Sequence, residues 1–360
     1  MKSKQPKTKD ITKLIRPEVR KLRAYFIDET PYRIKLDAME NPFTLPDEVR
    51  QEIAEAARNA AINRYPDPSA EKLKESIAEY WGIGTKRMVL GNGSDELIQA
   101  IILAFGGPVL VPAPTFAMYE LTSRALAQEV VSVPLNRDFD LNADKMLKKA
   151  KEIKAKVIFL ACPNNPTGNR FSDEAVLKIL NKADAAVVID EAYFSFSGKT
   201  FLPVLREHPN MIILRTLSKI GFAGLRIGVL TASAKIIDQL SKIRLPYNIN
   251  TLSQAAAVAA LRQRNVLNQQ ISQLISARQR LYNALSQMKR VTAYPSETNF
   301  ILFRTTIDAT RVHEKLKNAG ILIKDLNKPG PLKNCLRVTV GTAEENSEFL
   351  KVVKHILGAN

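Results

Sequence analysis

Residues 216–228 read TLSKIGFAGLRIG and follow the apolar run 211–214. An aliphatic run that leads into a hydroxyl residue, a lysine and glycines is typical of a buried strand whose carboxyl end carries a reactive amine. Lys219 is the candidate amine. Because a free lysine has a pKa of about 10.4, it attacks a carbonyl at neutral pH only where burial or a nearby cation, here Arg226, lowers that pKa.

The same turn has the side chains of a phosphate site. The planar guanidinium of Arg226 suits a phosphate dianion, and Ser218 can donate its hydroxyl beside it. A lysine that forms a Schiff base next to such a site indicates pyridoxal phosphate. The alternative is a surface loop after a core strand, with Lys219 merely solvated, and short motifs of this kind often match by chance.

Length and composition are those of a globular protein. With 360 residues, 45% hydrophobic and 25% charged, the chain can form two domains, or one large domain with a satellite. No apolar run is long enough to span a membrane, and no apolar segment follows the basic N-terminus, so we expect a cytoplasmic protein. Cys162, Cys335 and the three histidines lie in no metal-binding or disulfide spacing, so no metal is expected.

The net charge of +17 raises a different hypothesis, a basic nucleic-acid-binding protein. Against this hypothesis, lysine and arginine are spread along the whole chain, aromatic residues make up only 7%, and no nucleic-acid-binding motif stands out. We therefore expect no nucleic-acid partner and interpret the charge as solvated surface that attracts anionic substrates.

Three continuous apolar runs, 157–161, 186–189 and 211–214, alternate with helical segments. Strands that are apolar throughout predict a mostly parallel sheet covered by helices on both faces, whose ligands bind at the carboxyl ends of the strands. The residues that follow these runs are Asn165, Asp190, Tyr193, Ser218 and Lys219. Asp190 can keep the pyridine nitrogen of the cofactor protonated, since a pair about 4 Å apart at an effective dielectric near 20 is worth roughly 4 kcal/mol.

Two further segments predict cofactor contacts. Gly91 and Gly93 precede Ser94 and Asp95 at a helix start, a pattern that favours an anion site but also occurs as a simple helix cap. Phe116 follows the strand 109–111, where it can stack on a flat ring or pack in the core.

The C-terminal third predicts a separate unit. A long helix over 251–288, broken near 264–265, precedes strands at 299–303, 321–324 and 335–340 and helices near 308–319 and 343–357. The predicted fold is therefore α/β, a large domain with a mostly parallel sheet plus a smaller α+β domain. We place the N-terminal arm and first strand, 1–45, with the small domain, the large domain at 46–247 and the small C-terminal domain at 248–360.

Ordered motifs along the chain resemble the fold type I, aspartate-aminotransferase-like pyridoxal phosphate enzymes. They are GNGSDE, PNNPTG, DEAY, TLSK with AGLR, and LRVTVGT. Within this group and its class II subgroup, LDAMENPF, NRYPDP, APTF and NCLRVTVGTAEEN are similar to the histidinol-phosphate aminotransferases. The resemblance covers residues 12–357.

The resemblance implies a role for each matched residue. Lys219 would be the Schiff-base lysine and acid/base, Asp190 the pyridinium partner, and Asn165 and Tyr193 the phenolate partners. Phe116 would stack on the ring, while Ser94, Asp95, Ser218 and Arg226 would surround the phosphate of the cofactor. Tyr65 would reach that phosphate from the neighbouring subunit, which implies a homodimer, and Arg337, Lys324 and Asn41 would bind substrate.

The implied reaction transfers the amino group of L-histidinol phosphate to 2-oxoglutarate, giving imidazole-acetol phosphate and glutamate in histidine biosynthesis. Arg337 lies in an alternating strand, where an anionic substrate or a surface ion pair explains its charge. Lys324 stands where the family commonly has arginine, and lysine keeps the charge but loses bidentate geometry. Two alternatives therefore remain on this scaffold, a threonine-phosphate decarboxylase and an aromatic aminotransferase.

Overall fold

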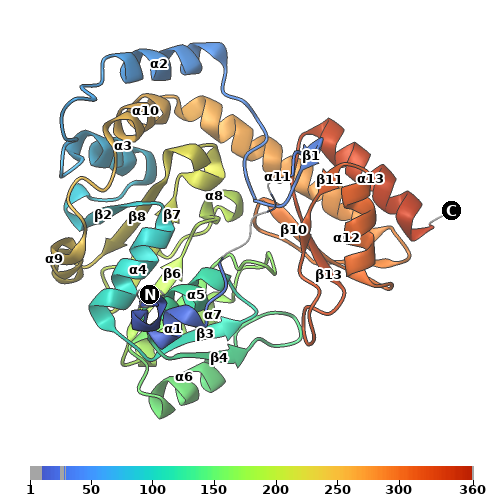
Figure 1. The fold of residues 1–360 in the computed structure, drawn as a ribbon, viewed down its shortest axis with the longest axis horizontal. Helices are drawn as coiled ribbons and strands as arrows, with labels where there is room; N and C mark the ends of the chain where they lie inside the picture. The colour runs from blue at the N-terminus through green and yellow to red at the C-terminus, as the bar shows by residue number, and fades with distance from the viewer. Residues whose placement is uncertain (1–9, 25–27, 29, 359–360) are drawn as a thin grey trace, which may run out of the picture.

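The computed structural model describes residues 10–24, 28 and 30–358, and within them the largest element is a seven-stranded sheet (Figure 1). Its strand order is β2 (Met88–Asn92), β8 (Ile227–Ala232), β7 (Met211–Thr216), β6 (Ala186–Asp190), β5 (Val157–Ala161), β3 (Val109–Ala113) and β4 (Val130–Pro134). Only β8 runs against the others, since its pairings with β2 and β7 are antiparallel. The predicted mostly parallel sheet is confirmed.

Both faces of this sheet are covered by helices, which explains its continuous apolar strands. Along β5, Val157 and Phe159 pack with α4 (Ser94–Phe105), α5 (Ala117–Ala125) and α9 (Ala234–Ile243). Ile158 and Leu160 face the opposite way, toward α6 (Ala143–Glu152) and α7 (Asp173–Lys182). Because successive side chains of a strand point to opposite faces, both faces of β5 are apolar.

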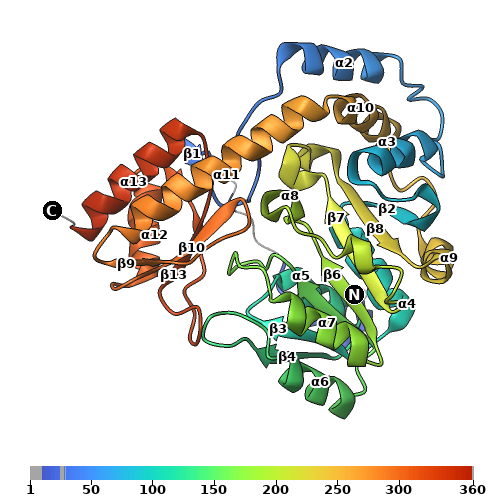
Figure 2. The ribbon, with the colours of Figure 1, turned by 180° about the vertical axis from the view of Figure 1, so that it is seen from behind.

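A smaller antiparallel sheet forms the second part of the described chain (Figure 2). Its order is β12 (Lys324–Asp325), β13 (Cys335–Thr339), β10 (Phe300–Thr305) and β9 (Val291–Ala293). The helices α11 (Arg264–Ser286), α12 (Ala309–Asn318) and α13 (Ala343–Leu357) share a core with it. This arrangement is the predicted smaller α+β unit.

The N-terminal strand joins this smaller unit. β1 (Ile34–Lys35) pairs in parallel with β11 (Ile321–Leu322), and Leu36 N donates to Leu322 O at 2.7 Å. The chain then leaves the smaller unit, passes the edge of the larger sheet and continues to α2 (Asp47–Arg58) and α3 (Glu71–Trp81). Residues 34–46 therefore connect the two units.

The helical segment expected over 251–288 with a break near 264–265 is confirmed as two helices, α10 (Thr251–Arg262) and α11, which meet at Gln263; α10 packs on α2 and α3. The N-terminal arm forms short helical turns at Ile11–Leu14 and Pro17–Arg20, and Arg16 Nη2 donates to Ala125 O at 2.7 Å. Residues 1–9 of that arm lie outside the described residues, and the domain boundaries at 45/46 and 247/248 stay predictions.

No helix in the described part of the chain is long and apolar enough to cross a membrane.

Candidate active site

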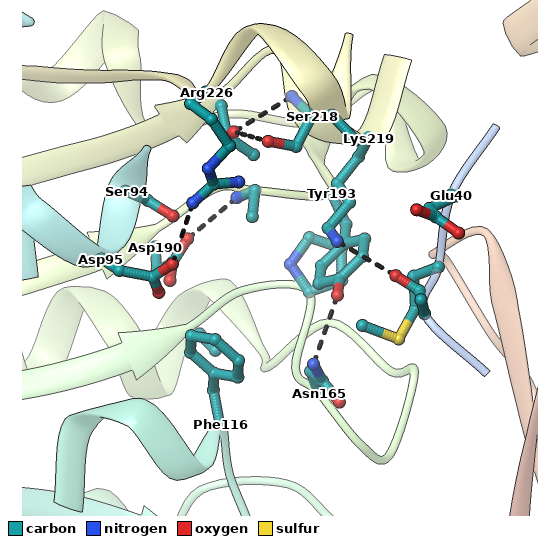
Figure 3. A pocket seen from close by; sticks show the side chains of 17 residues that line it. Glu40, Ser94, Asp95, Phe116, Asn165, Asp190, Tyr193, Ser218, Lys219 and Arg226 are labelled. Atoms are coloured by element: carbon teal, nitrogen blue, oxygen red, sulfur yellow. Dashed lines mark hydrogen bonds and ion pairs between the residues drawn. The ribbon is translucent and has the colours of Figure 1, made fainter. Parts of the chain in front are cut away.

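A cavity of about 220 Å³ lies at the carboxyl ends of the strands of the larger sheet (Figure 3). Its wall includes residues of the larger sheet and of the segment 38–40 that leads away from β1. Nine predicted site residues line it: Ser94, Asp95, Phe116, Asn165, Asp190, Tyr193, Ser218, Lys219 and Arg226. The sheet therefore brings together side chains that are up to 132 positions apart in sequence, from Ser94 to Arg226.

Lys219 lies on the helical turn Ser218–Ile220 that follows β7. Its Nζ lies 3.4 Å from the carbonyl oxygen of Ala38 and 5.9 Å from the centre of the Tyr193 ring. Burial and the positive charge of Arg337 lower the pKa of Lys219 to about 8. This shift raises the neutral fraction of the amine at pH 7 from about 0.03% to about 10%, so a much larger share of Lys219 than of a surface lysine is in the form that can attack a carbonyl or accept a proton.

The turn that presents Lys219 is fixed by its own hydrogen bonds. Thr216 Oγ1 accepts from Ser218 N at 3.1 Å and donates to Ser218 Oγ at 2.9 Å. Gly221 ends the turn with φ of 122°, a backbone conformation that residues with a Cβ rarely adopt. The sequence TLSKIG thus specifies both the turn and the direction of its lysine.

Opposite this turn, the start of α4 lies at one end of the cavity and offers features that favour an anion. Ser94 and Asp95 lie in the first turn of the helix, where unpaired N–H groups and the helix dipole favour negative charge. Arg226 faces this terminus and its Nη2 lies 3.3 Å from Asp95 Oδ2. A Cβ on Gly228 would lie 2.5 Å from Gly93 C and Ser94 N, so only glycine permits this close approach.

Asp190 is the last residue of β6 and is 4% exposed. Its Oδ1 accepts from Ala192 N at 3.0 Å, and its Oδ2 accepts from Tyr119 Oη at 2.6 Å. Burial raises the pKa of Asp190 to about 6, and the hydrogen bonds from Tyr119 and Ala192 oppose that rise. The site thus holds a buried carboxylate whose ionised form a cationic partner would stabilise further, most clearly below pH 6.

Asn165 connects the two parts of the fold. Its Nδ2 donates to Tyr193 Oη at 3.2 Å, and its Oδ1 accepts from Arg337 Nη1 at 2.5 Å. Arg337 Nη2 also donates to Asp37 O at 2.9 Å. Burial raises the pKa of Tyr193 well above its ordinary value, so its hydroxyl remains a donor at physiological pH.

Phe116 lies at the start of α5, on the side of the cavity away from Arg226 (Figure 3). Its ring meets the Tyr119 ring edge-on, with centroids 5.5 Å apart. This contact fixes a flat aromatic face in the cavity wall.

Four predicted site residues, Arg337 among them, lie outside the cavity wall. Lys324 is the register partner of Arg337 across β12 and β13, so both side chains leave the same face of the small sheet. Asn41 Nδ2 donates to Gln270 Oε1 at 3.0 Å and to Ile220 O at 3.4 Å, behind the turn of Lys219. Tyr65 is 82% exposed and stacks on Tyr247 at 4.5 Å. Their roles stay predictions.

Sequence reasoning missed three residues at this site. Glu40 lines the cavity and its charge opposes the lowering of the Lys219 pKa. Met39 lines it too, held at φ of 55° while its N–H donates to Thr339 Oγ1 at 3.0 Å. The third is Tyr119, which donates a hydrogen bond to Asp190. The sequence could have indicated it, because a tyrosine on the apolar face of a helix needs a hydrogen-bond partner for its hydroxyl.

The described residues contain no group of three or more His, Cys, Asp and Glu side chains that could hold a metal ion. Cys162 and Cys335 are both free and buried. The cavity wall itself carries lysine, carboxylate, hydroxyl and guanidinium groups.

The family profile described as aminotransferase class I and II matches residues 32–353. The chain therefore belongs to the class I and II aminotransferase family.

Similar proteins identify the family within this class to which the chain belongs. Histidinol-phosphate aminotransferase 2 of Nitrosococcus oceani is 45% identical over 354 residues, which cover 96% of this chain and 98% of that protein. The histidinol-phosphate aminotransferase of Aquifex aeolicus is 37% identical, with coverage of 95% and 97%. Such identities over nearly whole chains place this chain in the histidinol-phosphate aminotransferase family within that class.

Solved structures share the fold. The crystal structure of histidinol-phosphate aminotransferase from Sinorhizobium meliloti, in complex with pyridoxal-5'-phosphate, superposes with a TM-score of 0.85. It is 24% identical and the match covers 94% of this chain and 97% of that one. An L-threonine-O-3-phosphate decarboxylase from Porphyromonas gingivalis matches with a TM-score of 0.78 at 24% identity, over 90% of this chain and 99% of that one. These likenesses establish the aspartate-aminotransferase-like architecture.

Proposed function

We propose that the protein is a pyridoxal-phosphate-dependent transaminase. It transfers the amino group of L-histidinol phosphate to 2-oxoglutarate and so gives imidazole-acetol phosphate and glutamate, a step of histidine biosynthesis. The observation that carries this proposal is a single cavity into which Lys219, Asp190 and Arg226 project from three sides. The two free buried cysteines fit the reducing environment of the cytoplasm, which is the compartment we propose.

The cavity fits pyridoxal 5'-phosphate at each of its functional groups. The helix start at Ser94, with Arg226 and Ser218 beside it, suits the phosphate, because the first turn of a helix has unpaired backbone N–H groups. Asp190 suits the ring nitrogen and Phe116 the ring face. When bound, the cofactor supplies an electron-withdrawing ring that stabilises negative charge on the substrate carbon.

The residues of the chain have distinct proposed roles. Lys219 would hold the cofactor covalently, and its amine would move the proton at the substrate carbon that bears nitrogen. Asp190 would keep a proton on the ring nitrogen. Tyr193 Oη accepts a hydrogen bond from Asn165 Nδ2, so its own hydrogen is available to the phenolate oxygen of the cofactor.

Substrate recognition is proposed for the small sheet. Arg337 lies at the edge of the site through its bond to Asn165, and Lys324 stands opposite it in register. Together they offer two cations for the phosphate of histidinol phosphate and for a carboxylate of 2-oxoglutarate. Lys324 contributes a point charge where an arginine would bind in bidentate fashion.

The products that the protein forms from different substrates distinguish this reaction from the decarboxylase and aromatic aminotransferase alternatives. We expect the purified protein with pyridoxal phosphate to form glutamate from 2-oxoglutarate and L-histidinol phosphate, measured by coupled assay or chromatography. L-threonine O-3-phosphate should release no CO₂, and aromatic amino acids should give kcat/KM values at least about tenfold lower, since they lack the phosphate that an arginine and a lysine recognise. CO₂ release, or a preference for aromatic substrates, would reject the named substrate but keep the cofactor.

We also propose a homodimer with shared active sites. Tyr65 and Tyr247, which stack on each other, belong with Ile62, Leu245 and Leu252 to the exposed large apolar side chains. Apolar residues of this size on a surface favour an interface between subunits. In the dimer, Tyr65 would reach the phosphate end of the partner's cavity.

Mixing two impaired variants tests the shared site. Tyr65→Ala and Lys219→Ala should each be poorly active alone, but a co-refolded mixture should regain up to about a quarter of wild-type activity, because each mixed dimer has one intact site. The oligomeric state is measured by light scattering. A mixture no more active than the mean of its two components would reject the contribution of Tyr65 across the interface.

A further inference from the structure

Tyr119 is a fully buried residue that has no role in the reaction proposed above. Its hydroxyl donates to Asp190 Oδ2 at 2.6 Å, while the residue itself lies behind the cavity wall. The ring stacks on Phe159 with centroids 4.6 Å apart and an angle of 11° between the ring planes. The Phe116 ring meets it edge-on. Packing thus holds the hydroxyl in one direction, toward Asp190.

The charges around Asp190 make this hydrogen bond important for the ionisation state of the carboxyl group. Burial and two neighbouring carboxylates, Asp95 of α4 and Glu191 beside it in the chain, favour the protonated acid. The groups that favour the carboxylate are the Tyr119 hydroxyl from α5 and the backbone N–H of Ala192. The nearby hydroxyl of Tyr193 is uncharged, since burial raises its pKa. Among these contacts, the Tyr119 hydroxyl is therefore the one side-chain group that donates a hydrogen bond to Asp190.

Tyr119 is suited to remain a donor. Burial and the charge of Asp190 raise the pKa of Tyr119 well above that of a free tyrosine, so its proton stays in place at physiological pH. With one donor on each oxygen, Asp190 cannot rotate without losing a bond, and its remaining lone pairs can face the cavity that it lines. Substitution of this tyrosine therefore changes both the direction and the charge state of the carboxylate.

We propose that Tyr119 is a positioning residue that aims Asp190 and keeps it ionised, so that the proton of the pair resides on the ring nitrogen of pyridoxal phosphate. The inference rests on the proposed function. Without the Tyr119 hydroxyl, the balance shifts toward a protonated Asp190 that donates to a neutral ring nitrogen. A neutral ring withdraws electrons less strongly, so proton removal from the substrate slows while substrate binding is unaffected.

The first test compares the wild-type holoenzyme with Tyr119→Phe, loaded with pyridoxal phosphate labelled with ¹⁵N in the ring. We expect the ¹⁵N chemical shift of a protonated nitrogen in the wild type and a shift toward the unprotonated value in the variant. The cofactor dissociation constant should rise roughly 10- to 100-fold, as for loss of a hydrogen bond to a charged group. The kcat should fall while KM for 2-oxoglutarate stays within about twofold.

A matched control and a second variant separate positioning from folding. Tyr32→Phe removes another tyrosine-to-carboxylate bond, Tyr32 Oη to Asp28 Oδ2 at 3.0 Å, away from the cavity, and should leave the ¹⁵N shift unchanged. Incorporation of 3-fluorotyrosine at position 119 keeps the ring and the hydroxyl donor, so the ¹⁵N shift should stay at the protonated value, unlike that of Tyr119→Phe.

The outcomes distinguish the inference from the function. If the wild type binds labelled cofactor and Tyr119→Phe leaves the ¹⁵N shift where it is in the wild type, the role of Tyr119 is rejected and the transaminase remains. If the wild type takes up no cofactor, the proposed function itself fails.

Discussion

Lys219→Ala should reduce transamination by about 10⁴-fold, because the substitution removes both the covalent attachment of the cofactor and the group that moves the proton. The visible absorption of the holoenzyme should change at the same time, since alanine cannot form a Schiff base. Lys219→Arg is the matched control: it keeps a positive charge but cannot attack the aldehyde, so it should be equally inactive. Activity in either variant above about 1% of wild type would contradict the assignment.

The pH dependence of cofactor capture tests the same lysine. Its pKa lies near 8 instead of 10.5, because burial and Arg337 disfavour the charged form. Only the neutral amine attacks, so the rate at which apoprotein captures pyridoxal phosphate should rise about tenfold per pH unit below pH 8 and level off above it. Stopped-flow absorbance measures this rate. A rate that keeps rising to pH 10 would show that the fold does not activate Lys219.

Arg215→Met should destabilise the protein by about 3–5 kcal/mol, since it leaves the carboxylate of Glu191 buried without its partner. Arg215 Nε and Nη2 donate to Glu191 Oε2 at 3.0 and 2.8 Å, and both side chains are 2% exposed or less. The guanidinium also lies 3.7 Å from the centre of the Phe194 ring. Urea unfolding measures the loss, at fixed protein concentration because a dimer links stability to concentration.

The double variant Arg215→Met with Glu191→Leu is the control for this prediction. It removes both charges, so it should recover most of the lost stability even though it restores no hydrogen bond. Thr200 Oγ1 also donates to Glu191, at 2.9 Å and 2.8 Å, and would face an apolar group in that variant. Equal stability of the single and double variants would mean that the buried charge is not the cause.

The sequence predicts the strands β5, β6 and β7 well because each is buried on both faces, and a short continuous apolar run between turn residues is typical of such a strand. The cavity residues at their ends follow from the same logic, as parallel strands end at one edge. By contrast, β4 is an edge strand with mostly half-exposed residues and gives no such run. In α6, the buried Met146 and Ala150 are spaced for a helix, but the surrounding lysines conceal the pattern.

Contacts between distant elements escape sequence reasoning for a different physical reason. The bond of Tyr119 to Asp190 depends on how α5 is rotated against β6, and tertiary packing sets that rotation. The bonds of Asn41 to Gln270 and Ile220 likewise join three elements whose separation no local pattern encodes. Residues at strand ends are therefore predictable, whereas the partners that orient them are not.

The pairing of β1 with β11 has a consequence for synthesis on the ribosome. Ile34 and its partner Ile321 are 287 positions apart in the chain. The cavity wall at Ala38, Met39 and Glu40 continues from that strand. All strands of the larger sheet are made before β11, so that sheet can form while the chain is still emerging, but its cavity gains this wall only after β11 has been made. The growing chain therefore has to keep β1 unpaired while the residues between the two strands are synthesised.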